Sequence, residues 1–322
     1  MFGHGSPQHP ELPAASFICA FLVLVPLPAL WRAGNVATLS IIAWLFVVNV
    51  IRGVNTLIWA NNIDLRLPVW CDITTKILLG ETIALPAAAV CICSYLAAVS
   101  DVRTASATLE QRRRRKLFEV FMCYILPMIW MALHYIVQGH RYDIIEHLGC
   151  QATVYPSWVA LVLLTIFPLV LALVAFAYAV IAIRNFYRRR IDFEKHLQST
   201  NSSLSRGRYL RLMLLASTEM IFDTTANAYT LSFNLTNAGV MLPYTSWADV
   251  HSNFSRVQPY PLVLIPTFAW REMLVLWWIT PVSTILFFCF FAFGRESMTI
   301  YRNWYETLRA RFFPRSAKAK AG

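Results

Sequence analysis

The sequence predicts an all-α membrane protein, a seven-transmembrane helix bundle with its N-terminus outside and its C-terminus cytoplasmic. Of its 322 residues, 57% are hydrophobic and only 14% are charged, whereas soluble domains average about 45–50% and about 25%. Seven apolar runs follow one another along the chain, and lysine and arginine gather in every second loop. Soluble, collagen-like, disordered and disulfide-scaffold classes are therefore excluded.

The spans follow the apolar runs, at about 20 residues per helical crossing. They are 15–30, 37–59, 69–99, 117–137, 157–183, 210–235 and 268–293. The first contains Pro26 and Pro28, so its ends are the least sharply defined, and the third is so long that it must tilt or project beyond the hydrocarbon. The apolar stretch Pro259–Pro266 is too short and too rich in proline to cross, and we expect a structured surface loop there.

The distribution of basic residues fixes the predicted orientation. Of 28 lysine and arginine residues, 22 fall on the side that carries the first, third and fifth inter-span segments and the tail. Because basic loops stay cytoplasmic, this places the N-terminus outside and requires an odd number of spans. The net charge of +11 is thus mainly a topological signal, and nucleic-acid binding is not expected. With no lysine or arginine in the first ten residues, the first span should act as an uncleaved signal anchor.

Residues 1–293 are expected to form the membrane domain, and 294–322 a short basic cytoplasmic tail. The inner loops offer a positive surface to an acidic or membrane-bound protein partner, although stop-transfer clusters have the same composition. The basic residues expected on this surface are Arg103, Arg112, Arg113, Arg114, Arg115, Lys116, Arg188, Arg189, Arg190, Arg208 and Arg211.

Polar residues inside the spans point to a buried site, because a charge in the bilayer costs several kcal/mol unless it is paired or hydrated. In the second and sixth spans they recur at helical spacing and form two stripes, and the third span adds further charges. Two interpretations stay open and are compatible: a polar ligand cavity, or a structural ion pair of Arg52 with Glu219 or Asp223. Asp72 and Lys76, four residues apart, can neutralise each other. The cavity candidates are Asn49, Arg52, Asn55, Lys76, Glu81, Glu219, Asp223 and Asn227.

Among the seven cysteines, only Cys71 and Cys150 lie toward the outer, oxidising side. We expect a disulfide between them that holds the second outer loop over the bundle; the alternative is two free thiols packed as small hydrophobic residues. The sequon at Asn253 lies in an outer loop and is a glycosylation candidate.

Catalytic and cofactor signatures are missing from the sequence. It contains no metal-spaced His/Cys cluster, no nucleophile elbow and no phosphate-binding glycine loop, so we expect neither an enzyme nor a cofactor or metal. A seven-span topology with a basic inner face fits both G-protein-coupled receptors and retinal proteins. A retinal protein needs a lysine in its last span, and 268–293 has none.

Three long strings carry a family resemblance. They are WCDITTKILLGETIALPAAAVCICSYL (Trp70–Leu96), YIVQGHRYDIIEHLGC (Tyr135–Cys150) and SWADVHSNFSRV (Ser246–Val257). The chain resembles the lipopeptide (a-factor-type) mating pheromone receptors of fungi, class D G-protein-coupled receptors, and the basidiomycete branch in particular. The resemblance runs from about Pro28 to Tyr301.

The resemblance implies a multi-pass plasma-membrane receptor that binds a farnesylated peptide pheromone and activates a heterotrimeric G protein. The outer segment before Cys150 would then be a lid or entrance for the ligand, or else a loop without ligand contact; its residues are Gln138, His140, Arg141, Tyr142 and Asp143. A constitutively active or orphan receptor and, less favoured, a small-molecule transporter are the alternatives.

The chain departs from the family pattern in two places. Family members usually have a proline in the middle of the sixth span, where this chain has Asp223-Thr224-Thr225, so the hinge of activation is expected to be altered or displaced. The tail Arg295–Gly322 is short for the family, which implies that desensitisation elements are missing or that the gene model is cut short.

Overall fold

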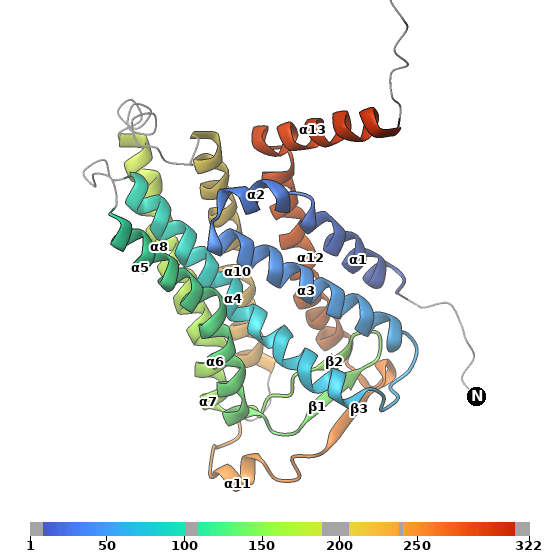
Figure 1. Cartoon of the computed structure of the whole chain (residues 1–322). Helices are drawn as coiled ribbons and strands as arrows, with labels where there is room; N and C mark the ends of the chain where they lie inside the picture. Colours follow the sequence, from blue (N-terminus) through green and yellow to red (C-terminus); the bar gives the residue numbers. More distant parts are fainter. Residues whose placement is uncertain (1–8, 101–107, 189–205, 238–240, 313–322) are drawn as a thin grey trace, which may run out of the picture.

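The computed structural model describes residues 9–100, 108–188, 206–237 and 241–312. Long helices run side by side, a small sheet closes one end of the bundle, and helix α13 crosses the other end (Figure 1). The α-helices are α1 (Glu11–Leu24), α2 (Leu27–Ala33), α3 (Val36–Ile58), α4 (Pro68–Ser100), α5 (Leu109–Val120), α6 (Leu126–Leu133), α7 (Trp158–Leu161), α8 (Phe167–Arg188), α10 (Arg206–Asn237), α11 (Trp247–Val250), α12 (Thr267–Ala292) and α13 (Arg295–Phe312).

The first predicted span is broken in two. Helices α1 and α2 meet at Pro26 with a bend of 41°, because proline can neither donate a backbone hydrogen bond nor tolerate the preceding turn without a kink. Helix α2 ends at Gly34, whose φ of 65° is left-handed, a conformation that glycine adopts without strain.

Two other prolines follow π-helical turns. The turn η1 (Phe121–Ile125) precedes Pro127, and η3 (Val162–Ile166) precedes Pro168. The wider turn shifts the backbone bonding so that the N–H after it reaches back five residues, to Phe121 and Val162 respectively. Such a bulge accommodates the proline ring and the backbone hydrogen bond that proline cannot donate.

The fourth helical unit starts earlier than predicted, at Leu109, because Thr108 and Gln111 form a capping box.

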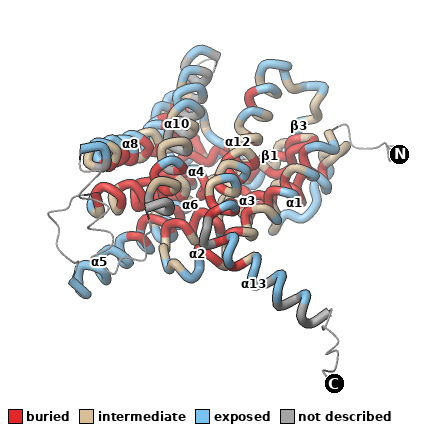
Figure 2. Tube along the Cα trace, turned by 90° about the horizontal axis from the view of Figure 1, so that it is seen from above, coloured by how far each residue is buried: buried red, intermediate tan, exposed pale blue. Residues whose placement is uncertain are grey.

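Helix α4 is the central helix and packs against α3, α6, α8 and α10. Figure 2 shows burial concentrated along this part of the bundle. Its middle carries a run of small residues, including Ala87, Ala88 and Ala89, all at most 5% exposed. Small side chains let neighbouring helices approach closely, which is how helices associate where the surroundings are themselves apolar.

Helix α8 shows the division between the bundle interior and its surroundings. Its buried stripe consists of alanines at a spacing of three or four residues: Ala172, Ala175, Ala179 and Ala182. Large apolar side chains such as Phe176 and Ile181 are half exposed on the other faces. An apolar outer surface with a small-residue interior is the pattern of a helix that faces lipid.

The small sheet at the end of the bundle corrects the all-α prediction. Strand β1 (Tyr142–Ile145) pairs antiparallel with β2 (Gly149–Gln151) and parallel with β3 (Val257–Tyr260), in the order β2-β1-β3. The stretch predicted as a structured loop, Pro259–Pro266, begins in β3 and continues into the 3-10 turn η4 (Leu262–Leu264). Short strands that pair across more than a hundred residues leave no local signal for sequence analysis.

Five helical units of the described residues are long and apolar enough to cross a membrane, and the bent pair α1–α2 makes six. The five are Val36–Ile58, Pro68–Ser100, Leu109–Val137, Trp158–Asn185 and Thr267–Ala292. The predicted span 210–235 does form the 32-residue helix α10, but α10 is not among these units because its sequence is richer in polar residues. A mostly helical protein with five or six apolar spans agrees with a membrane protein, and the count of seven remains a prediction.

Candidate functional site

A covalent link holds the sheet to the bundle. Cys71, in the first turn of α4, forms a disulfide with Cys150 in β2, and their Cα atoms lie 5.3 Å apart. Around it, Trp59, Tyr142 and Ile144 form a buried apolar cluster. The sheet therefore lies as a lid across this end of α3 and α4.

Beneath the lid, three helices meet at a buried charged pair. Arg52 of α3 lies with its Nη2 3.5 Å from Oε2 of Glu81 in α4, and the two side chains are 16% and 7% exposed. Arg52 Nη1 donates to the carbonyl of Trp277 in α12 at 2.6 Å, and Thr280 Oγ1 donates to Glu81 Oε1 at 2.7 Å. The cluster ties α3, α4 and α12 together.

The structure gives Arg52 an acidic neighbour that the sequence analysis did not pair with it, Glu81 of the third span. The pairing of Arg52 with Glu219 or Asp223 of the sixth span remains a prediction. The side chains of Glu219, Asp223 and Asn227 lie outside the described residues, so their place in a cavity remains a prediction. Helical periodicity identifies the polar face of α3, but it does not reveal which helix that face meets.

The two asparagines of the α3 stripe lie at different levels. Asn49 Nδ2 donates to Thr284 Oγ1 of α12 at 2.9 Å, one turn deeper than Arg52. Asn55, one turn higher, accepts a 2.8 Å hydrogen bond from Trp70 Nε1. Both side chains are at most 1% exposed. The stripe thus serves helix contacts along its length in this conformation, and its place in a ligand cavity remains a prediction.

The sequence suggested that Lys76 and Asp72 neutralise each other, but each makes its side-chain hydrogen bonds with other residues. The Nζ of Lys76 lies 2.9 Å from His134 Nδ1 and donates to Gln138 Oε1 at 2.6 Å. Asp72 instead receives two hydrogen bonds from Arg141, at 2.9 and 2.6 Å. Such a bidentate pair is geometrically specific, although both side chains remain more than a third exposed. The two charges of α4 therefore hold the lid from separate points.

The predicted entrance residues are mostly built into the lid. Gln138, His140 and Tyr142 are at most 9% exposed, and His140 Nε2 lies 2.6 Å from Asp143 Oδ1. Burial raises the pKa of Asp143, against the opposing influence of His140 and Arg256. In this conformation segment 138–143 packs against the lid and the bundle, and of the predicted entrance residues only Arg141 and Asp143 keep partly exposed side chains.

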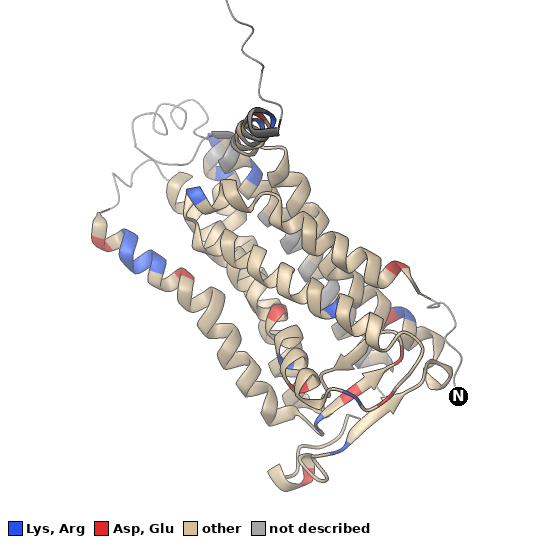
Figure 3. Ribbon diagram, turned by 45° about the vertical axis from the view of Figure 1, so that its right-hand side comes forward, with Lys and Arg blue, Asp and Glu red and all other residues tan. Residues whose placement is uncertain are grey.

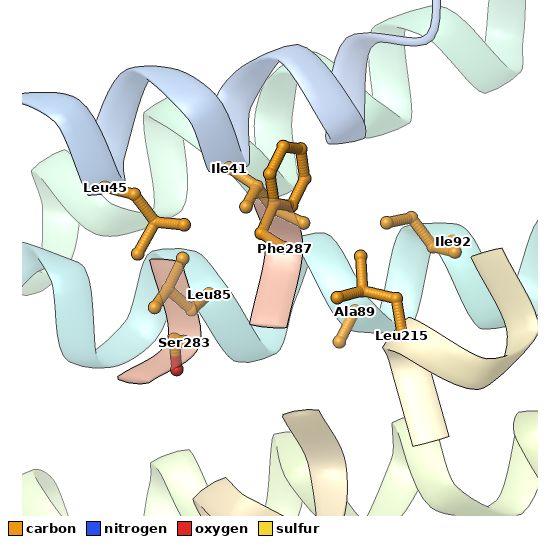
Figure 4. A pocket seen from close by; sticks show the side chains of 8 residues that line it. All are labelled: Ile41, Leu45, Leu85, Ala89, Ile92, Leu215, Ser283 and Phe287. Atoms are coloured by element: carbon orange, nitrogen blue, oxygen red, sulfur yellow. The ribbon is translucent and has the colours of Figure 1, made fainter. Parts of the chain in front are cut away.

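An apolar cavity of about 20 Å³ lies one turn below the Arg52–Glu81 pair. Figure 4 shows its lining, contributed by four helices: Ile41 and Leu45 of α3, Leu85, Ala89 and Ile92 of α4, Leu215 of α10, and Ser283 and Phe287 of α12. A space of this size and polarity has room for about one water and is expected to be dry. It marks a loosely packed junction of the helices that the polar cluster joins above.

Basic residues gather at the opposite end of the bundle, near α13 and the start of α5 (Figure 3). Not all of them are free to meet a partner. Arg115 bonds Glu119 at 2.9 Å and its guanidinium lies 3.8 Å from the centre of the Tyr95 ring. A Cβ added at Gly294 would collide with the guanidinium of Arg211. Both arginines therefore support helix packing.

The remaining basic candidates divide into two groups. The exposed ones are Arg112, Arg113, Arg114, Lys116 and Arg188; of these, Arg114 pairs with Glu110. Arg103, Arg189 and Arg190 lie outside the described residues, as does the side chain of Arg208. Asn253, in the turn that follows α11, is exposed, as a glycosylation acceptor must be.

Several site residues were not singled out from the sequence. Thr280 and Thr284 complete the polar cluster of α3 and α4, and the buried Glu272 and His147 are additional titratable groups. Thr280 and Thr284 could have been found from the sequence, because two threonines four residues apart in an apolar span lie on one helix face. No group of three potential metal ligands occurs among the residues that the structure describes.

The buried imidazole of His147 is expected to make the stability of the lid depend on pH. His147 lies in the β1–β2 turn and is 2% exposed. Burial lowers its pKa and His9 lowers it further, whereas Glu146 and, less strongly, Glu11 oppose this shift. The pKa of His147 is lower in the folded protein than in the unfolded chain, so the neutral imidazole favours the folded state. His147 therefore contributes to folding stability above about pH 6.5, and this contribution is lost as the pH falls below that value. The melting temperature of the detergent-solubilised protein should drop between pH 7.5 and 5.5.

The matched variant is His147→Asn, because asparagine tolerates the positive φ of 68° at this position. It should reduce the drop in melting temperature. An equal pH dependence in the variant would contradict the assignment to His147.

Comparisons with known proteins agree on one family. Residues 11–311 match the family model described as pheromone A receptor. The pheromone B beta 1 receptor of Schizophyllum commune is 47% identical over 295 residues, covering 92% of this chain and 54% of the relative. Pheromone receptor 2 of Mycosarcoma maydis is 31% identical, over 86% of this chain and 80% of the relative.

A more distant relative is the pheromone a factor receptor of Saccharomyces cerevisiae, 28% identical over 61% of this chain and 43% of the relative. The chain spans about half the length of the Schizophyllum commune relatives that it matches.

Proposed function

The chain belongs to the pheromone A receptor family, and from this we propose that it is a G-protein-coupled mating pheromone receptor. It binds a farnesylated peptide pheromone on its outer side and activates a heterotrimeric G protein on its inner side. The observation that carries the proposal is the family match over residues 11–311, together with 47% identity to a pheromone receptor. The matching family is one of receptors and not of enzymes.

The proposed topology has seven spans over residues 1–293, an outer N-terminus and the basic segment 294–322 in the cytoplasm. Support comes from the distribution of charge: α13 and the exposed arginines of α5 lie at one end of the bundle, and the disulfide-linked sheet lies at the other (Figures 1 and 3). Basic segments stay cytoplasmic and disulfides form outside. In this topology α1 with α2 forms the first span and α10 the sixth, the receptor resides in the plasma membrane, and Asn253 can be glycosylated.

Ligand action is proposed to begin at the lid and to reach the inner face through the helix junction below it. The peptide contacts the lid and the polar groups beneath it, while the prenyl chain partitions into apolar surroundings. The Arg52–Glu81–Thr280 cluster joins α3, α4 and α12 directly under the lid. A ligand shifts the bundle only if it binds the active arrangement more tightly than the resting one, and this junction is where α12 can change its contacts.

A reporter assay in a fungal cell without its own pheromone receptors tests the proposal. Surface-expressed receptor is challenged with synthetic peptides, each as a farnesylated methyl ester and without the prenyl group. We expect a response to a farnesylated peptide and at least about a hundredfold weaker response to its unprenylated form, since each buried CH₂ contributes about 0.8 kcal/mol.

A high basal signal without any peptide response would favour an orphan or constitutively active receptor instead. Silence throughout, with receptor present at the surface, would contradict receptor function, and substrate flux would then be measured for the transporter alternative.

A further inference from the structure

Glu272 is a buried carboxylate that the polar cluster does not use. It lies in the second turn of α12 and is 7% exposed. Among the residues that the structure describes, no basic side chain lies within ion-pairing distance of it. Ionised groups buried in a membrane protein normally have a partner or a function, because an unpaired one costs several kcal/mol.

The direction of Glu272 follows from helical geometry. It precedes Ser283 by eleven residues, close to three full turns, so the two share a face of α12. Ser283 lines the apolar cavity together with Leu215 of α10, and α12 packs against α10. Glu272 therefore lies on the α10-facing side of α12, toward the lid end of the helix.

Within the part of the chain that the structure describes, this environment supplies no positive charge. Helix α10 contains no lysine or arginine beyond Arg211, at its opposite end. The other cations of the lid half have contacts elsewhere: Arg52 with Glu81, Arg66 with Asp64, Arg141 with Asp72, Arg256 with His140, and Lys76 with His134 and Gln138. Arg271 is exposed and points about 100° away around the helix.

The helix dipole does not explain why a carboxylate occupies this buried position. Acidic residues are favoured within the first turn of a helix, whereas Glu272 is the sixth residue of α12, which starts at Thr267. Packing does not account for it either, since a glutamine or leucine fills a similar volume without the cost of a buried charge. Neither the helix dipole nor packing supplies a partner for this carboxylate, and a cation that arrives from outside the chain would supply one.

We propose that Glu272 binds a positively charged group of the peptide ligand, either its amino terminus or a lysine or arginine side chain. The contact forms in the seam between α12 and α10, on the lid side of the bundle. This inference rests on the proposed function, because it assigns a subsite to the same peptide. It makes Glu272 a residue that discriminates between peptides by charge.

The experiment is a double-mutant cycle between receptor and ligand, read with the G-protein reporter. The probe is the farnesylated methyl-ester peptide that activates the wild-type receptor, compared with versions in which the amino terminus is acetylated or each basic residue is replaced by glutamine. The receptors are wild type, Glu272→Gln and Asp64→Asn, an exposed outer carboxylate paired with Arg66 that serves as the control.

Glu272→Gln should raise the half-maximal concentration of the intact peptide at least about tenfold. One of the peptides that lacks a positive charge should be equally weak on wild type and on Glu272→Gln. In that peptide the contact with Glu272 is already lost, so the receptor change causes no further loss. Asp64→Asn should respond like wild type. If Glu272→Gln does not reach the surface, Glu272→Asp replaces it, with the same coupling criterion.

Additive losses for every peptide version, or an unchanged response of Glu272→Gln, would overturn the assignment of Glu272 and leave the receptor function intact. A wild-type receptor that responds to no farnesylated peptide would overturn the proposed function and this subsite with it.

Discussion

Replacing Glu81 by glutamine is expected to destabilise the folded receptor by about 3 to 5 kcal/mol. The change leaves the guanidinium of Arg52 buried without its counter-charge, while the side chain keeps its volume. It also weakens the hydrogen bond from Thr280, at 2.7 Å, because a neutral amide oxygen accepts less strongly than a carboxylate. The measurement is thermal unfolding of purified receptor in detergent at neutral pH.

Two variants make this prediction specific. Glu306→Gln removes an exposed partner of Arg302 in α13 and should change stability by less than about 0.5 kcal/mol, as surface pairs do. The double variant Arg52→Met with Glu81→Met replaces the pair by apolar groups and should recover most of the loss, since no unpaired charge remains. A Glu81→Gln protein as stable as wild type would contradict the structural importance of the pair.

Replacing Cys71 or Cys150 by serine is the second large effect, an expected loss of about 2 to 5 kcal/mol. The disulfide closes a loop between residues 79 apart in sequence, so its removal frees a long segment. It also disconnects the lid from α4 and loosens the buried cluster around Trp59 and Tyr142. We expect strongly reduced surface display and a lowered melting temperature.

The pattern among variants identifies a single bond. The double serine variant should be no less stable than either single variant, because both changes remove the same link. Cys289→Ser, at an exposed free cysteine of α12, should behave like wild type. Additive losses at Cys71 and Cys150 would indicate two independently packed thiols and contradict the covalent lid.

The helices could be predicted from the sequence because each is a continuous apolar run, a signal contained within one segment. Pro26 marked the first span as poorly defined, although not as bent, and the π-helical turns before Pro127 and Pro168 were not predicted. The three-stranded sheet was missed, since Tyr142–Ile145 finds its parallel partner more than a hundred residues later.

The site was predicted by residue type more reliably than by pairing. Arg52 and Glu81 were both identified as candidates from the energetic cost of intramembrane charge, yet their pairing with each other was not foreseen. Lys76 and Asp72 are neighbours on one helix, and longer-range partners, His134, Gln138 and Arg141, compete successfully for them. Spacing along a helix describes its faces, whereas the partners depend on how the helices are arranged.

The most direct test of the receptor assignment measures nucleotide exchange in a purified system. Receptor in lipid nanodiscs is mixed with a heterotrimeric fungal G protein, and GTP-analogue binding is followed with a farnesylated peptide methyl ester, with its unprenylated form and with neither. The account predicts that the farnesylated peptide accelerates exchange and that the unprenylated peptide at the same concentration does not. Equal exchange in all three conditions, for a receptor preparation that is folded and for every peptide of the panel, would contradict it.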